Sequence, residues 1–255
     1  MKQKLTFLHQ NKPLITTQVQ ASNPDDLLRL VRIASQQGCD AYGVQMEQME
    51  EQYRTEEALR PVFDEMARKP IYATNYRCAK NAGKSDEELV KGYMWLLDMG
   101  ATLIDVLGDL YSPAQYEITY DAVAIEKQKA LIETIHARGG EVLMSSHTFT
   151  FMTAEEVLKI AMEHRARGAD ISKIVTAANT EEEELENLKT TALLRRELDI
   201  PFLFLSVGTH VKLHRTIGPA FGSCMWLTVA EYDALATRAQ PLLRSIRSIA
   251  DSMEF

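Results

Sequence analysis

The sequence has few cysteines and no long apolar run. Its three cysteines, Cys39, Cys78 and Cys224, are scattered without the spacing of a metal site, which predicts reduced thiols in a cytoplasmic protein. No apolar run approaches the roughly 18 residues of a membrane span, so we expect no membrane partner. The lysines near the start are not followed by a long apolar segment, so no signal peptide is expected.

The overall composition is that of a globular protein with an acidic surface. Hydrophobic residues make up 45 % of the chain and charged residues 25 %, which excludes disordered and fibrous classes. The net charge of −8 argues against nucleic acid as a partner. A length of 255 residues, without a linker or low-complexity stretch, predicts one domain over residues 1–255.

Short apolar runs alternate with longer helical segments eight times along the chain, as βαβ crossovers require. No Gly-x-Gly-x-x-Gly follows the first run, which argues against a dinucleotide-binding Rossmann fold. Eight units in this length predict a single (β/α)8 TIM barrel in the α/β class. The expected strands are Leu14–Val19, Asp40–Met46, Ile71–Tyr76, Thr102–Leu107, Glu141–Ser146, Asp170–Thr176, Phe202–Ser206 and Ala220–Met225.

The helix boundaries carry recognisable capping signals. Ser85 and Thr153 each precede a glutamate by three residues, as in a capping box, where hydroxyl and carboxylate satisfy backbone amides reciprocally. A glycine ends several helices shortly before the next strand, as in αβ connections. These glycines are Gly38, Gly100, Gly139 and Gly168.

Polar residues near the ends of buried strands are informative, because the carboxyl ends of barrel strands form the active-site mouth. Lys173 is the most notable, since alternation places it on one face with Ile171 and Val175. Burial disfavours the ammonium form and makes a free amine available as a nucleophile for a Schiff base with a carbonyl substrate. The alternatives are a lysine that extends to the barrel mouth or pairs with a carboxylate. Asp105 fits either a site or a structural role equally well.

His147 ends the strand that precedes the strand of Lys173, so both side chains should meet at one mouth. An imidazole can move protons beside an imine, which acts as an electron sink. Arg215 is either a carboxylate clamp or a surface arginine at a helix end. The remaining histidines form no metal pattern, so no metal is expected.

These residues resemble the type I 3-dehydroquinate dehydratase family over about residues 12–250. Three segments carry the resemblance: Ser145-Ser146-His147-Thr148-Phe149, Gly168-Ala169-Asp170-Ile171-Ser172-Lys173-Ile174, and Leu205-Ser206-Val207-Gly208 continuing to Arg215-Thr216-Ile217-Gly218-Pro219-Ala220-Phe221-Gly222-Ser223. The family consists of Schiff-base hydro-lyases of the shikimate and quinate pathways, so the resemblance implies dehydration of 3-dehydroquinate to 3-dehydroshikimate in a cytoplasmic homodimer. It implies no metal or organic cofactor, and a small cyclic keto acid as substrate.

The resemblance also implies roles for residues. Lys173 would condense with the ketone, and His147 would take the proton beside the imine and then protonate the departing hydroxyl. Arg215 would hold the substrate carboxylate, and Arg77 would lie near the substrate hydroxyls. Gln240 would stand in for the glutamine of the C-terminal lid, and Gln45 and Asn81 would be further substrate-binding residues.

The sequence departs from the family pattern at several places. The Glu-x-Arg pair of the second strand is Gly43-Val44-Gln45, and the Asp-x-Glu of the fourth strand ends in Leu107. The glutamate that orients the histidine is replaced by Asn81, so His147 is expected to lack its supporting carboxylate. These changes leave two alternatives open: a lyase or aldolase that forms an imine with a different cyclic keto acid, and a non-catalytic barrel that binds a carboxylated ligand.

Overall fold

The protein forms a barrel of eight parallel strands surrounded by helices. A computed structural model describes residues 5–253. The strands run in the order β7-β6-β5-β4-β3-β2-β1-β8, and neighbouring strands are parallel. Cys224, just before β8, donates its backbone N–H to Phe202 O on β7 at 2.8 Å, which nearly closes the sheet. The strands are β1 (Leu14–Val19), β2 (Ala41–Gln45), β3 (Ile71–Thr74), β4 (Leu103–Leu107), β5 (Glu141–His147), β6 (Ile171–Ala177), β7 (Phe202–Val207) and β8 (Met225–Val229).

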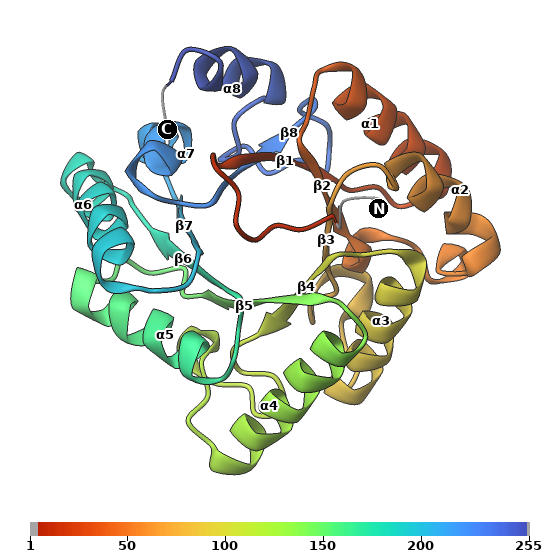
Figure 1. Cartoon of the computed structure of the whole chain (residues 1–255), viewed down its shortest axis with the longest axis horizontal. Coiled ribbons are helices and arrows are strands. Elements are labelled where there is room, and N and C mark those ends of the chain that lie inside the picture. The colour runs from red at the N-terminus through yellow and green to blue at the C-terminus, as the bar shows by residue number, and fades with distance from the viewer. Residues whose placement is uncertain (1–4, 254–255) are drawn as a thin grey trace.

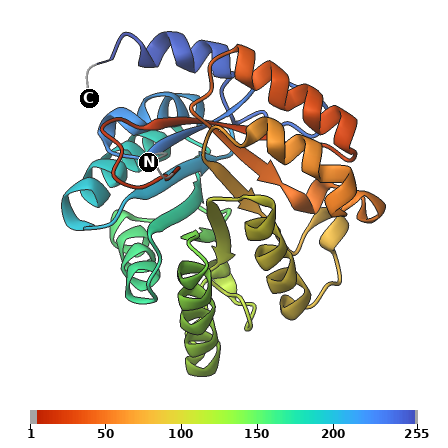
Figure 2. The ribbon, with the colours of Figure 1, turned by 45° about the vertical axis from the view of Figure 1, so that its right-hand side comes forward.

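The helices surround the strands, as the two views in Figure 1 and Figure 2 show. Both predicted capping boxes, at Ser85 and Thr153, are present, and Gly100 ends its helix with φ +109°, in the left-handed region that favours glycine. No helix within residues 5–253 is long and apolar enough to cross a membrane. The helices are α1 (Pro24–Gln36), α2 (Glu56–Met66), α3 (Asp86–Met99), α4 (Ala122–Ala137), α5 (Ala154–Ala166), α6 (Glu181–Glu197), α7 (Lys212–Ile217) and α8 (Leu243–Ala250).

The predicted (β/α)8 barrel is confirmed, and seven predicted strands overlap the observed ones within two residues at each end. The eighth was wrong: Ala220–Met225 was expected, and the strand is Met225–Val229. Gly218–Phe221 forms a 3-10 turn instead, and Gly222 follows it with φ +126°. The observed strand, Met-Trp-Leu-Thr-Val, contains the branched and aromatic residues that favour a strand.

The barrel interior is apolar at the end where the strands begin. Leu14, Leu103, Leu143 and Ile171 belong to one buried cluster there, which Phe7 of the preceding segment joins. Phe7 N donates to Glu141 Oε2 at 2.9 Å, so residues 5–13 cover this end. The polar interior residues therefore lie toward the opposite end, where the strands finish.

Candidate active site

Lys173 lies on β6 inside the barrel, and its side chain is only 5 % exposed. Its Nζ donates to three oxygens: Tyr72 Oη at 3.0 Å, Tyr76 Oη at 2.5 Å and Asp105 Oδ2 at 3.1 Å. An ammonium has three donors, so this set accounts for all of them. The amine of Lys173 is therefore buried and held in place by side chains from β3, from the loop after β3 and from β4.

Asp105 is fully buried on β4 and is the negative member of this cluster. Burial raises the pKa of Asp105, but the charges of Lys173 and His147, with hydrogen bonds from Ser145 and Tyr72, outweigh it and hold the pKa below its usual value. Burial and the Asp105 charge raise the pKa of Tyr72 and Tyr76 well above the ordinary 10. Both phenols therefore stay protonated at neutral pH.

His147 ends β5 and has a carboxylate partner after all. Its Nδ1 lies 2.7 Å from Glu117 Oε2, and its backbone N donates to the same oxygen at 3.1 Å. The ring also makes an edge contact with Tyr76, whose centroid is 5.2 Å away. The expectation that His147 lacks support is therefore wrong. The carboxylate comes from Glu117, in the loop after β4, rather than from position 81.

The Glu117 loop adopts strained backbone and is braced from several sides. Tyr116 and Glu117 have φ of +63° and +50°, a region that costs free energy for non-glycine residues. Ser146 Oγ donates to Glu117 O at 2.8 Å, and Glu117 N donates to Ala114 O. Ala114 N in turn donates to Asp109 Oδ2 at 2.9 Å. Strain persists only where the surroundings over-determine the geometry, which these contacts do.

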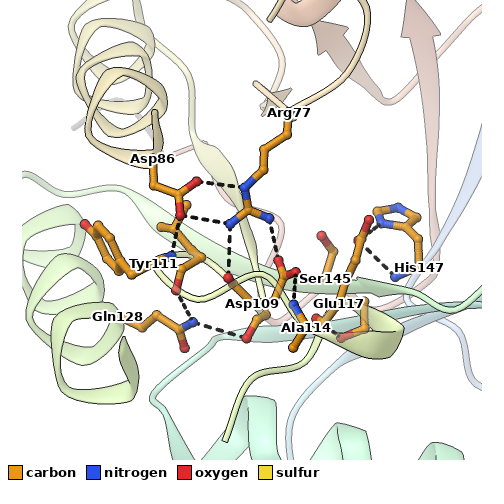
Figure 3. A network of polar contacts seen from close by, with 12 residues as sticks. Arg77, Asp86, Asp109, Tyr111, Ala114, Glu117, Gln128, Ser145 and His147 are labelled. Atoms are coloured by element: carbon orange, nitrogen blue, oxygen red, sulfur yellow. Dashed lines mark hydrogen bonds and ion pairs between the residues drawn. The ribbon is translucent and has the colours of Figure 1, made fainter. Parts of the chain in front are cut away.

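Arg77 completes this bracing network (Figure 3). Its guanidinium pairs with Asp86 at 2.7 Å and with Asp109 at 2.6 Å, and it also donates to Asp109 O at 3.0 Å. The two carboxylates raise the pKa of Arg77 above its ordinary value, against the opposing effect of burial. Four of its five donors are used within the protein, so the arginine expected near the substrate hydroxyls is anchored to the loop of Glu117.

Asn81 is fully buried in a separate hydrogen-bond network. Its Oδ1 accepts from Arg54, and its Nδ2 donates to Asn75 Oδ1 at 2.7 Å and to Tyr76 O at 2.8 Å. These contacts occupy the side-chain amide and hold the backbone at Tyr76. Asn81 thus supports the loop after β3 and makes no hydrogen bond with His147.

Arg215 on α7 is a buried cation without an ion pair in residues 5–253. Its Nε donates to Ser206 O at 2.6 Å, at the end of β7. Burial lowers the pKa of Arg215 from 12.5 to about 10. Since a buried charge is costly unless it is paired, this guanidinium is suited to an anionic ligand such as a carboxylate.

Two glutamines that were predicted to bind substrate have side-chain groups without a hydrogen-bond partner among the described residues. Gln45 ends β2 half-buried, and its side chain makes no hydrogen bond to the described residues. Gln240 lies in the segment after β8 with 5 % exposure, and its Oε1 has no partner within residues 5–253. Both amides are therefore available to a ligand that can reach them. No group of His, Cys, Asp and Glu side chains within the described residues has the arrangement of a metal site.

Glu47 is a buried carboxyl beside the site that the sequence reasoning missed. It follows β2 and accepts from Thr74 Oγ1 at 3.0 and 2.8 Å and from Tyr76 N at 3.4 Å. Burial raises the pKa of Glu47 from 4.5 to about 7, although these hydrogen bonds oppose the rise. Glu47 thus links the ends of β2 and β3. The sequence feature that could have identified it is a glutamate just past a buried strand.

Several solved barrels are similar in fold: a type I 3-dehydroquinate dehydratase from Clostridium difficile with covalently modified comenic acid aligns with a TM-score of 0.78 at 18 % identity, covering 98 % of each chain. The 3-dehydroquinate dehydratase of Geobacillus kaustophilus aligns with a TM-score of 0.77 at 18 % identity, covering 96 % of this chain and 93 % of that one. The fold is thus that of the (β/α)8-barrel class to which these lyases belong.

Sequence comparison assigns the family within this class. The family model for type I 3-dehydroquinase matches residues 15–254, and the chain belongs to that family. The 3-dehydroquinate dehydratase of Lactiplantibacillus plantarum is 29 % identical over 178 residues, which is 68 % of this chain and 65 % of that protein. That of Alkaliphilus oremlandii is 31 % identical over 117 residues, 45 % of each. The matches thus span less than two-thirds of these two curated relatives.

Proposed function

We propose that the protein is a hydro-lyase that dehydrates 3-dehydroquinate to 3-dehydroshikimate through an imine at Lys173. The observation that carries the proposal is the pairing, at one barrel mouth, of a buried amine with an imidazole that has its own carboxylate. Family membership supports the same reaction class. A small cyclic keto acid is the substrate that such a site can enclose.

The first step forms the carbon–nitrogen bond. Lys173 loses a proton, for which the Asp105 carboxylate at 3.1 Å is an acceptor within reach, and the amine attacks the ketone carbon. The carbonyl oxygen takes up protons and leaves as water, and the imine nitrogen keeps one proton as an iminium. His147 is the proposed proton donor for this step, since Glu117 holds its Nδ1 and leaves Nε2 for proton transfer.

The second step eliminates water from the ring. His147 takes the proton from the carbon beside the iminium, and the electron pair moves into the carbon–nitrogen system. The enamine then expels the ring hydroxyl, which receives that proton from His147 and leaves as water. Glu117 favours the imidazolium that exists between these transfers, because it lies 2.7 Å from the ring. Hydrolysis of the product imine returns Lys173.

Three further residues are proposed to bind the substrate. Arg215 binds the carboxylate, because its buried guanidinium lacks an ion pair among the described residues. Gln45 and Gln240 bind polar ring substituents through their free amides. Arg77 and Asn81 act on the loops around the site, since the protein already occupies their donors. A homodimer in the cytoplasm stays a prediction, which sedimentation and fractionation can check.

The reaction is tested by incubating the protein with 3-dehydroquinate and following the ultraviolet absorbance of the conjugated enone product. Turnover that disappears in a folded Lys173→Ala variant is the expected result. Absence of turnover in the wild type, with imine formation still present, would favour the alternative of a different cyclic keto acid. Absence of both, with retained binding of a carboxylated ring compound, would favour the non-catalytic barrel.

A further inference from the structure

Gln18 on β1 is a buried amide that the sequence reasoning did not single out. The residue is 4 % exposed, the same as Lys173, and its Oε1 has no hydrogen-bond partner within residues 5–253. Native proteins rarely leave a buried acceptor unpaired, because its lost contact with water is not replaced. A ligand that donates to this oxygen would remove the deficit.

The strand geometry directs Gln18 into the barrel. Alternation places it on the same face as Leu14, which packs in the interior cluster. In the strand register, Gln18 lies opposite Gly43 and Gly43 lies opposite Tyr72. The Tyr72 hydroxyl accepts from Lys173 Nζ at 3.0 Å. Gln18 therefore belongs to the row of interior positions that leads across β2 and β3 to the amine.

Gly43 provides the space that the Gln18 amide occupies. A Cβ placed at Gly43 would lie 2.6 Å from Gln18 Oε1 and 2.8 Å from its Cδ, closer than such atoms approach in proteins. A side chain at position 43 and the observed position of the Gln18 amide therefore exclude each other.

We propose that Gln18, accommodated by Gly43, determines substrate specificity by binding a hydroxyl on the ring of a cyclic keto acid. An amide offers both donor and acceptor, and a hydroxyl does the same, so the two groups are complementary. A site that hydrogen-bonds a hydroxyl discriminates against analogues that lack it. This inference rests on the proposed function, because it takes the ligand to be a keto acid whose carbonyl group reacts with Lys173.

The test measures the binding of two keto acids to the wild type and to the Gln18→Met variant. Methionine has a shape similar to that of glutamine but cannot make these hydrogen bonds. One is 3-dehydroquinate, and the other is 3-oxocyclohexane-1-carboxylate, which has the ketone and carboxylate without ring hydroxyls. Borohydride trapping and intact mass give the concentration that half-saturates adduct formation. We expect Gln18→Met to raise this concentration about 10-fold or more for 3-dehydroquinate, with little change for the other compound.

The matched control is Thr17→Val, which removes a buried hydroxyl from the opposite face of the same strand, where Thr17 contacts Thr228 at 3.0 Å. It should leave both concentrations unchanged. Equal effects of Gln18→Met on both compounds, or none, would overturn the proposal. Gln18→Met should also melt no lower than the wild type, since it removes an unpaired acceptor. Gly43→Ala, which displaces the amide, provides a second variant with the same expected loss.

A failure of the proposed function is distinguishable from a failure of this inference. If the wild type traps neither keto acid, the imine at Lys173 is refuted. Gln18 is then tested alone by calorimetry with quinate, a hydroxylated ring acid that has no carbonyl to react. Weaker binding to Gln18→Met than to the wild type and Thr17→Val supports the inference, and equal binding to all three overturns it.

Discussion

Replacing the buried carboxyl of Glu47 by an amide should change how stability depends on pH. The pKa of Glu47 is raised from 4.5 to about 7, mainly by burial. One pKa unit corresponds to about 1.4 kcal/mol, so the shift amounts to about 3 kcal/mol in the free energy of unfolding. Because the folded pKa is the higher one, this stability is fully present below about pH 4.5. It is lost as pH rises through about 7, when the buried carboxyl must ionise.

Glu47→Gln cannot ionise, and its amide oxygen can still accept from Thr74 and from Tyr76 N. Relative to the wild type, the variant should therefore gain about 3 kcal/mol between pH 4.5 and pH 8. Urea unfolding at both pH values measures the difference, in which other titrating groups largely cancel. Thr74→Val removes a hydroxyl that donates to both carboxylate oxygens, so it should steepen the wild-type loss. If the difference in unfolding free energy between Glu47→Gln and the wild type is the same at both pH values, the pKa of Glu47 is not raised by folding.

The other predictions concern catalysis and are measured by steady-state kinetics on 3-dehydroquinate. Glu117→Gln should lower kcat about 10- to 100-fold with little change in KM, because a charge-assisted hydrogen bond to His147 contributes about 1.5–3 kcal/mol; an unchanged kcat would contradict the pairing. Arg77→Met should lower kcat about 10-fold, through loosening of the loop that carries Glu117, whereas a rise in KM alone would show direct contact with substrate. Arg215→Met should raise KM about 100-fold, since it removes charge-assisted hydrogen bonds, and a loss of kcat alone would contradict a binding role.

The barrel could be predicted because its determinants are local. Alternation of short apolar runs with capped helices does not depend on distant contacts, and the capping boxes at Ser85 and Thr153 are present as expected. The eighth strand was misplaced because Ala220 and Phe221 look strand-like, while Pro219 and Gly222 set a turn there.

The electrostatic surroundings of the site were harder to predict, because they depend on loops. Glu117 reaches His147 from an irregular segment with left-handed backbone, which no periodicity marks. Tyr72 on β3 and Tyr76, two residues after its end, have the same alternation parity, but an aromatic residue at such a position usually indicates core packing. The partners of Arg77 lie 9 and 32 residues away in the chain, so its anchoring emerges only in three dimensions.

The proposed function depends on an imine between the buried amine of Lys173 and a cyclic keto acid. The most direct measurement is intact-protein mass after incubation with 3-dehydroquinate and sodium borohydride, with Lys173→Ala treated in parallel. We expect one covalent adduct on the wild type, located at Lys173 by peptide mapping, and none on the folded variant. An adduct of equal yield on both proteins, or no adduct on the wild type under conditions that give turnover, would contradict it.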